Sequence, residues 1–237
     1  MDIIKKLAQE LAIKEEQAKA AVQLIDEGNT IPFIARYRKE MTGALNDETL
    51  RNLHERLLYL RNLEEKKEQV INAITDQGKM TEDLKEKILS AETLVAVDDL
   101  YRPYRPKKQT RATKAKEKGL EPLANILLLQ KTTKSMEEEA AAFVNAEKGV
   151  VNAKEAIAGA KDIIAEMIAD MADYRKSIRN CTMKQGSLVV KAKDEKAESV
   201  YEMYYDFREP LSKVTGYRVL AINRGEKEKF LTVKVEA

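Results

Sequence analysis

The stretch ETLRNLHERLLYLRNLEEKKEQVINAITDQG, residues 48–78, decides the fold class of this chain. Apolar residues recur through it in steps of three and four, the spacing of one face of an α-helix. They are Leu50, Leu53, Leu57, Leu60, Leu63, Val70, Ile71 and Ile74. Asn46 or Asp47 can cap this helix, which precedes Gly78. We therefore predict a helix about 45 Å long, at 1.5 Å per residue, in a mostly helical protein.

Shorter helical patterns lie on both sides of this segment. Thr30 and Pro32 mark the start of one short helix, because a proline is well tolerated in the first turn. We expect this helix to end at Gly43. The same apolar spacing predicts further helical stretches at residues 3–11, 18–25, 81–89, 94–100, 120–127 and 136–146.

A second long helix is predicted over residues 157–178. Its apolar residues alternate steps of three and four without a break and form a heptad seam. The seam either packs inside its own chain or joins two chains in a coiled coil. The other amphipathic helices favour internal packing, and hence a monomer.

Beyond Gly186 the spacing changes to strict alternation, which predicts strands at residues 188–193 and 231–236. We therefore divide the chain into a helical domain, residues 1–186, and a short α/β segment, residues 187–237. The predicted fold class is mostly α, with two long helices and a small α/β portion at the C-terminal end.

The composition excludes several classes of protein. With 43% hydrophobic and 35% charged residues, and only 9 Gly and 5 Pro among 237 residues, the chain is neither collagen-like nor low-complexity. The longest apolar run, residues 140–144, is far shorter than the roughly 20 residues of a membrane-spanning helix. The N-terminus lacks the pattern of a secretory signal, and a single cysteine agrees with a reducing compartment. We expect a cytoplasmic protein.

Residues for catalysis are scarce. His54 is the only histidine, which excludes a two-histidine metal site and a Ser-His-Asp triad within one chain. Cys181 lies on a predicted helix, and we expect a small buried or half-buried side chain. The acids at residues 98–99, and Asp170 with Asp173, are expected to be solvated or paired with arginines rather than bound to magnesium. No glycine-rich phosphate loop occurs, so we predict no enzyme, no metal and no cofactor.

Positive charge is concentrated in residues 102–118, where eight basic residues and one acid give +7. The whole chain carries +2, so the rest carries −5. This pattern favours an anionic partner. Cations bind phosphates by releasing counterions, and tyrosine rings stack on unpaired bases. The candidate nucleic-acid-binding residues here are Tyr101, Arg102, Tyr104, Arg105, Lys107, Lys108, Arg111 and Lys114.

The backbone of this segment supports two interpretations. Pro103 and Pro106 bias Arg102 and Arg105 away from the helical region, so residues 101–107 are predicted to be extended. They then present their cations to a polyanion. Alternatively, the tyrosines and prolines attach the segment to the helical body and the charges are merely solvated.

A second group of cations, Arg36, Arg38 and Lys39, is predicted on the third helix. We include it among the candidate nucleic-acid-binding residues. The competing interpretation is a solvated helical face, on which Arg36 and Glu40 are four residues apart and can pair.

Three separated blocks of this chain resemble the N-terminal region of the bacterial Tex family of transcription accessory proteins. They are TIPFIARYRKEMTGALNDE (30–48), DDLYRPYRPKKQTRATKAKEKGLEPLA (98–124) and YRVLAINRGEKEKFL (217–231). The resemblance covers nearly the whole chain. In the third block the family typically carries Ser-His-Arg where this chain has Gly216-Tyr217-Arg218, so no histidine role is transferred.

The resemblance implies a mostly helical scaffold with helix-turn-helix-like elements, in a cytoplasmic nucleic-acid-binding protein related to a eukaryotic elongation factor. The family's ribonuclease-H-like domain, helix-hairpin-helix pair and S1 domain are missing, so the chain is expected to be an N-terminal fragment or a shortened homologue. No catalytic residue is implied in the region covered.

Two hypotheses follow for the function. In the first, the chain is a transcription module whose cations contact RNA or DNA phosphates without reading bases. In the second, it is a scaffolding region that positions the missing domains and contacts the transcription machinery.

Overall fold

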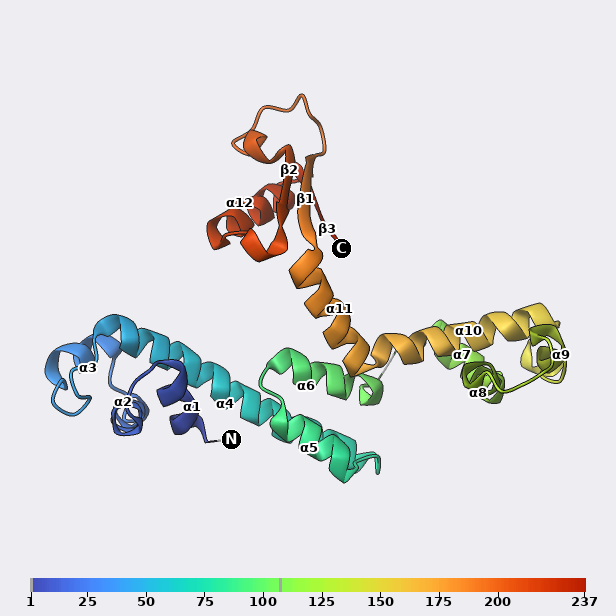
Figure 1. Cartoon of the computed structure of the whole chain (residues 1–237), viewed down its shortest axis with the longest axis horizontal. Helices are drawn as coiled ribbons and strands as arrows, with labels where there is room; N and C mark the ends of the chain where they lie inside the picture. Colours follow the sequence, from blue (N-terminus) through green and yellow to red (C-terminus); the bar gives the residue numbers. More distant parts are fainter. Residues whose placement is uncertain (1, 107) are drawn as a thin grey trace. The chain divides into compact units, whose positions relative to one another are not determined.

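Helices make up most of the computed structural model, which describes residues 2–106 and 108–237 (Figure 1). The α-helices are α1 (Ile3–Glu10), α2 (Glu15–Asp26), α3 (Ile31–Tyr37), α4 (Asp47–Asp76), α5 (Glu82–Ser90), α6 (Leu94–Tyr101), α7 (Arg111–Glu117), α8 (Glu121–Leu129), α9 (Met136–Ala141), α10 (Ala153–Asp170), α11 (Ala172–Gln185) and α12 (Gly216–Lys227). The short 3-10 helices are η1 (Arg102–Tyr104), η2 (Ala146–Lys148), η3 (Glu202–Tyr204) and η4 (Leu211–Lys213), and the strands are β1 (Ser187–Ala192), β2 (Asp206–Pro210) and β3 (Leu231–Glu236). The predicted fold class is confirmed.

The chain divides into two compact units, of which the first ends at Pro106. The boundary predicted at Gly186 lies inside the second unit, where helix α11 gives way to strand β1. It therefore marks a change of secondary structure, and as a domain boundary it stays a prediction. Within the described residues, no helix is both long enough and apolar enough to cross a membrane.

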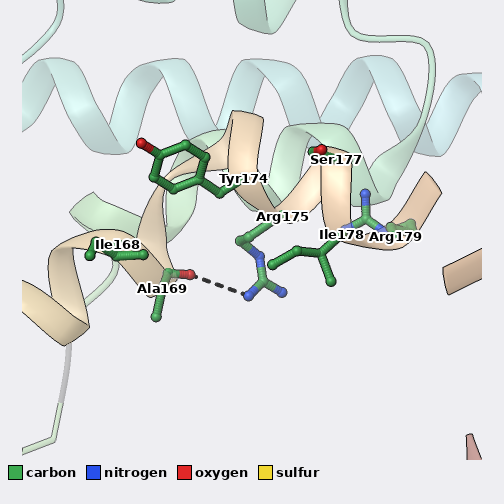
Figure 2. Close-up of a pocket in the computed structure, with 7 residues that line it drawn as sticks. All are labelled: Ile168, Ala169, Tyr174, Arg175, Ser177, Ile178 and Arg179. Atoms are coloured by element: carbon green, nitrogen blue, oxygen red, sulfur yellow. Dashed lines mark hydrogen bonds between the residues drawn. The ribbon is translucent and has the colours of Figure 1, made fainter. Parts of the chain in front are cut away.

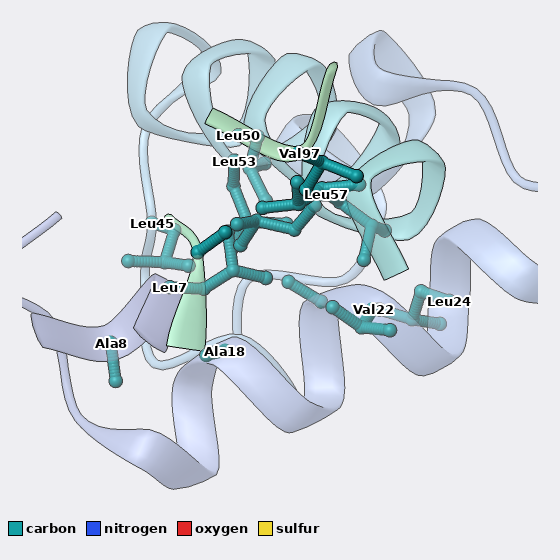
Figure 3. Packing of buried hydrophobic residues seen from close by; sticks show 14 of the residues in the cluster. Leu7, Ala8, Ala18, Val22, Leu24, Leu45, Leu50, Leu53, Leu57 and Val97 are labelled. Atoms are coloured by element: carbon teal, nitrogen blue, oxygen red, sulfur yellow. The ribbon is translucent and has the colours of Figure 1, made fainter. Parts of the chain in front are cut away.

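Helix α4 organises the first unit, and the long helix predicted there is confirmed. Its cap is Asn46, whose side-chain oxygen accepts a hydrogen bond from the backbone N–H of Thr49 at 2.7 Å. The leucine stripe of α4 is buried, and helices α1, α2, α3, α5 and α6 pack along it. Figure 3 shows this core, with Leu50, Leu53 and Leu57 of α4, Leu7 of α1, Val22 of α2 and Val97 of α6.

One lysine of α4 is buried inside this packing. Lys67 is only 2% exposed, and its ammonium group donates a hydrogen bond to the carbonyl oxygen of Leu89 at 2.8 Å. It also lies 2.8 Å from a carboxylate oxygen of Glu64. Both partners are needed, because a buried charge without hydrogen bonds is costly. Lys67 thereby ties α5 to the side of α4.

Helix α3 begins as predicted, with Thr30 as its cap and Pro32 in its first turn. It ends at Tyr37, so the predicted end at Gly43 is wrong. The chain then forms a loop in which Ala44 has a positive φ of 63° and donates its N–H to the carbonyl of Lys39 at 2.8 Å. Hydrogen bonds within this loop replace those of a longer helix.

The segment predicted to be extended is largely helical. Helix α6 continues to Tyr101, and η1 follows at once, with Arg102 at φ −52° and ψ −42° although Pro103 comes next. The turn places the rings of Tyr101 and Tyr104 against the first core, and this burial outweighs the local proline bias. Arg105, before Pro106, is extended as predicted.

The predicted helix over residues 157–178 is broken in two. Helix α10 ends at Asp170, Met171 has an extended backbone with ψ of 117°, and α11 starts at Ala172. Residues of the first half, such as Ile157 and Ala160, are buried in the core of α7 to α10, but Ile178 is 66% exposed. Internal packing therefore holds for the first half of the seam only.

The C-terminal sheet is antiparallel with the strand order β2-β1-β3. Both predicted strands are present and pair with each other, with Val190 opposite Val233. Strand β2 was not predicted, because its sequence DFREP is short and charged. Helix α12 contributes Ile222 to the core of this sheet. The helix-turn-helix-like elements stay a prediction.

Candidate nucleic-acid interface

The α7 patch consists of Lys108, Arg111 and Lys114 in the second unit, all exposed. The local fold explains why they face outwards. Ala112 and Ala115, each 4% exposed, form the inner side of α7 in a core shared with α10. With 3.6 residues per turn, Lys114 then points away from this inner side. Arg111 is the first residue of α7 and lies at the edge of the inner side, with its side chain 88% exposed.

The start of α7 is held firmly. The hydroxyl of Thr110 accepts a hydrogen bond from the N–H of Thr113 at 3.0 Å and donates one to a carboxylate oxygen of Glu166 at 2.8 Å. The first hydrogen bond is a helix N-cap, and the second ties the cap to α10. Arg111 and Lys114 therefore stand on an anchored helix, and Lys108 lies just before it.

Few acids lie near the α7 patch. Arg111 is 3.7 Å from Asp162, yet its side chain remains 88% exposed. Among the described residues, Lys108 and Lys114 have no ion pair. Two other cations of the basic segment are engaged: Lys116 lies 3.1 Å from Glu121, and Lys118 donates to the carbonyl of Gly149 at 2.8 Å. The patch thus keeps nearly its full positive charge.

The close packing of α7 and α8 on α10 depends on Gly159. A Cβ atom added there would lie 2.4 Å from the Cδ1 atom of Leu120 and 3.2 Å from the Cβ of Ala115. Leu120 is only 1% exposed, so its side chain has little room to move. A larger residue at position 159 would push away the helix that carries the patch.

Gly159→Val is expected to lower the free energy of unfolding by about 2 kcal/mol, because overpacking a core costs about 1–3 kcal/mol. The matched control is Ala158→Val, which places the same side chain at an exposed neighbouring position. Helix propensity alone predicts the opposite order, since valine is a better helix former than glycine and a worse one than alanine. Urea denaturation of both variants decides between packing and propensity.

The remaining part of the basic segment lies in the first unit and is partly neutralised. Arg105 is 2.7 Å from Asp98, and the same carboxylate lies 3.6 Å from Lys66. The guanidinium of Arg105 also lies 5.5 Å from the centre of the Tyr101 ring. The carbonyl of Tyr104 accepts a hydrogen bond from Gln77 at 3.0 Å. Both tyrosines are used in packing, as in the alternative interpretation.

The candidate residues of this segment therefore fall into two groups, one in each unit. Arg102 is exposed at the end of α6. Lys107 lies outside the described residues.

The α3 patch consists of Arg36, Arg38 and Lys39, which are all exposed. The guanidinium of Arg38 lies 5.0 Å from the centre of the Phe33 ring and donates to the carbonyl of Tyr37 at 3.1 Å. The pairing of Arg36 with Glu40, which the competing interpretation allowed, does not occur among the described residues. Since α3 ends at Tyr37, these two positions do not share one helical face.

Two polar residues that the sequence did not mark hold the loop after α3. The fully buried Thr42 donates its hydroxyl proton to the carbonyl of Arg38 at 3.2 Å. The side-chain amide of Gln17, on α2, donates to the carbonyls of Thr42 at 3.2 Å and Gly43 at 3.0 Å. Gly43 has a φ of 60°, and a Cβ there would lie 2.7 Å from Gln17.

Two arginines of α4 are matched with acids. Arg56 donates two hydrogen bonds to Glu10 and lowers the pKa of that carboxyl group. Arg61 does the same to Asp26, whose pKa is also lowered. Such bidentate pairs connect α4 with α1 and α2, and the opposite charges of the two partners neutralise each other. The α3 and α7 patches differ from them in having few or no acidic partners.

The structure also shows the surroundings of the cysteine and of the acidic residues that the sequence analysis considered. Cys181 is exposed, so the expected burial is wrong, because α11 contributes no buried residue to a core. Within the described residues, no group of three or more His, Cys, Asp or Glu side chains is arranged to hold a metal ion. Asp98 is engaged with Arg105, as the sequence led us to expect of such acids.

The shallow pocket on α11 and the end of α10 has apolar and basic walls. Figure 2 shows Ile168, Tyr174 and Ile178 around Arg175, which donates to the carbonyl of Ala169 at 3.4 Å. Tyr174 and Ile178 belong to the second half of the predicted heptad seam. The sequence pattern marked these two residues, but only the break at Met171 explains why they are not buried.

Each of the two units contains a region that matches a known protein family. Residues 1–75 match the family model of the Tex-like protein N-terminal domain, and residues 131–237 match that of the Tex central region-like family. The chain is 44% identical to Uncharacterized protein YdcI of Bacillus subtilis (strain 168), over 97% of this chain and 32% of that protein. It is 41% identical to Transcriptional accessory protein Tex of Neisseria gonorrhoeae, over 100% of this chain and 31% of that protein.

A more distant relative is S1 RNA-binding domain-containing protein 1 of Homo sapiens, with 32% identity over 99% of this chain and 24% of that protein. The chain therefore spans about a third or less of the length of these relatives.

Proposed function

Since the chain belongs to the Tex family, of which it carries the N-terminal domain and the central region, we propose that it associates with RNA or DNA without sequence specificity. In this role it is part of a transcription accessory protein and contacts the phosphate backbone through its exposed cations. The observation that carries the proposal is the α7 patch, three exposed cations of which, among the described residues, only Arg111 has an ion pair, with Asp162 at 3.7 Å.

Physical chemistry supports a phosphate contact at this patch. A polyanion gains affinity from Lys and Arg chiefly by releasing condensed counterions, and cations already paired with acids contribute less. Lys108 and Lys114 have no ion pair among the described residues, and Arg111 is 88% exposed. Contacts to the phosphate backbone carry no sequence information, so the contact is expected to position the chain rather than to select a sequence.

The names of relatives agree with this proposal. One relative is named as a transcriptional accessory protein and another as containing an S1 RNA-binding domain. The proposal is a binding role rather than an enzymatic one, with no cofactor, and is consistent with the single histidine of the chain. A cytoplasmic location and a monomeric state belong to the same proposal, which light scattering of the purified chain tests in part.

The salt dependence of binding tests the proposal. We expect the chain to bind a fluorescein-labelled 20-bp duplex more weakly as the salt concentration rises. If about five phosphates are neutralised, a plot of the logarithm of the association constant against the logarithm of the salt concentration should have a slope of about −4. Fluorescence anisotropy at several NaCl concentrations measures this slope. An affinity that does not change with salt, or the absence of binding at 50 mM NaCl, would contradict the proposal.

A second candidate function is a scaffolding region that contacts the transcription machinery. It is favoured by the packing of Tyr101 and Tyr104 against the first core and by the pairing of Arg105 with Asp98. It predicts that the isolated chain retards neither RNA nor DNA. A gel-shift titration at two salt concentrations therefore separates the two candidates.

A further inference from the structure

Helix α3 exposes an aromatic pair that the phosphate contacts do not use. Phe33 and Tyr37 are four residues apart, so their side chains lie on one face of the helix, and their ring centres are 5.3 Å apart at an angle of 44°. Tyr37 is 66% exposed. The guanidinium of Arg38 covers the Phe33 ring at 5.0 Å. An exposed tyrosine beside a second ring and a cation offers a flat surface to a ligand.

The pair is held in place by a buried residue of the helix and by the loop that follows it. Ile34, between the two rings in sequence, is fully buried in the first core and anchors α3. After the helix, the buried Thr42 and the amide of Gln17 hold the loop by hydrogen bonds to backbone carbonyls. A ligand that stacks on Tyr37 therefore does not have to order this part of the backbone, which favours binding.

The charge around the rings selects the kind of ligand. The cations of the α3 patch follow or flank Tyr37, and the only acid within residues 36–40 is Glu40. None of Arg36, Arg38 and Lys39 has an ion pair among the described residues. A ligand with a flat aromatic group and regularly spaced negative charges fits this combination. Unpaired nucleotides have both features, whereas the bases of a duplex are covered on both faces by their neighbours.

We propose that Phe33 and Tyr37 form a stacking platform for an unpaired base of single-stranded RNA or DNA, with Arg36 and Lys39 contacting the adjoining phosphates. This rests on the proposed function, which it deepens by assigning a base-stacking site to the exposed rings of α3. Arg38 remains on the Phe33 ring, while the exposed ring of Tyr37 receives the base.

The chain contains a natural control for this site. Tyr217 on α12 is 65% exposed and also has an arginine, Arg218, at 5.7 Å from its ring centre. Arg218, however, is bound by Glu209, whose hydrogen bond raises the pKa of the guanidinium. The tyrosine and its cation are thus matched, but the positive charge is neutralised. We expect no nucleotide to stack there.

The chain has no tryptophan, so a single substitution introduces a unique fluorescent reporter. We expect dT12 to quench the fluorescence of Tyr37→Trp at saturation and to leave that of Tyr217→Trp nearly unchanged. A 12-bp duplex bound to the same degree, as judged by anisotropy, should quench neither. Tyr37→Leu, which keeps an apolar side chain at an exposed position, should weaken dT12 binding about tenfold and leave the salt slope and the duplex affinity unchanged.

Each outcome decides between the two proposals. If dT12 binds the Tyr37→Trp chain but does not quench it, or quenches both reporters equally, the stacking platform is wrong while the proposed function stands. If Tyr37→Leu leaves dT12 affinity unchanged, the exposed rings serve a protein partner instead, which also overturns this inference. If the unaltered chain binds neither dT12 nor duplex at 50 mM NaCl, the proposed function itself fails.

Discussion

Replacing Lys108, Arg111 and Lys114 together by glutamate is expected to weaken duplex DNA binding at least about 100-fold at 50 mM NaCl. Three exposed cations disappear and three carboxylates take their place, so attraction to phosphate becomes repulsion. If all three contact phosphates, the log-log salt slope should fall in magnitude by about 3. Fluorescence anisotropy with the 20-bp duplex measures both changes.

The matched control is the triple replacement of Lys191, Lys193 and Lys196 by glutamate. These lysines are exposed near the end of strand β1, and their replacement changes the net charge of the chain by the same amount. We expect it to weaken binding only slightly, because these lysines are not part of the patch that is proposed to contact the phosphates. Equal effects of the two triples would show that overall charge, and not the α7 patch, governs binding. Far-UV circular dichroism checks that both variants are folded.

Leu57→Ala is expected to lower the free energy of unfolding of the first unit by about 3 kcal/mol. Leu57 is 1% exposed in the core of α4, and removing a buried leucine side chain costs its transfer free energy and leaves a cavity, together about 2–5 kcal/mol. Urea denaturation followed by far-UV circular dichroism measures the loss. Because the chain has two units, we expect the transition of one unit to shift while the other stays in place.

The neighbouring Leu58→Ala provides the control, since Leu58 is 54% exposed on the same helix. Its effect should be within about 0.5 kcal/mol, as for most surface substitutions. Similar losses for both variants would mean that the face of α4 assigned to the core is wrong. The comparison also matters for the α3 patch, because Ile34 anchors α3 in the same core.

Local chemistry explains which parts of the fold were predictable. The cap at Asn46, the leucine spacing of α4 and the proline in the first turn of α3 act within a few residues, so the sequence marks them directly. The alternation of strands β1 and β3 follows from one buried face and is equally local. The buried Lys67 was not predictable, because its partner at Leu89 is far away in sequence.

Two predictions were wrong for different reasons, one because tertiary burial overrode a local preference and one because a helix breaks within a periodic pattern. The two tyrosines of the Tyr-Pro segment pack against the first core, and the backbone therefore takes helical turns at Arg102 despite the following proline. The heptad seam continues across Met171 in sequence, but the backbone there is extended and the helix breaks. Periodicity records which residues are apolar and not whether one rigid helix carries them all.

The sequence by itself determined the helical character of the chain, the position of α4 and the concentration of cations in residues 102–118, since each depends on residue types and their spacing. Tertiary structure alone decided which cations remain available. It pairs Arg105 with Asp98 and leaves Lys108 and Lys114 without an ion pair among the described residues. The physical reason is that charge belongs to a residue, whereas its neutralisation depends on an acid brought near by folding.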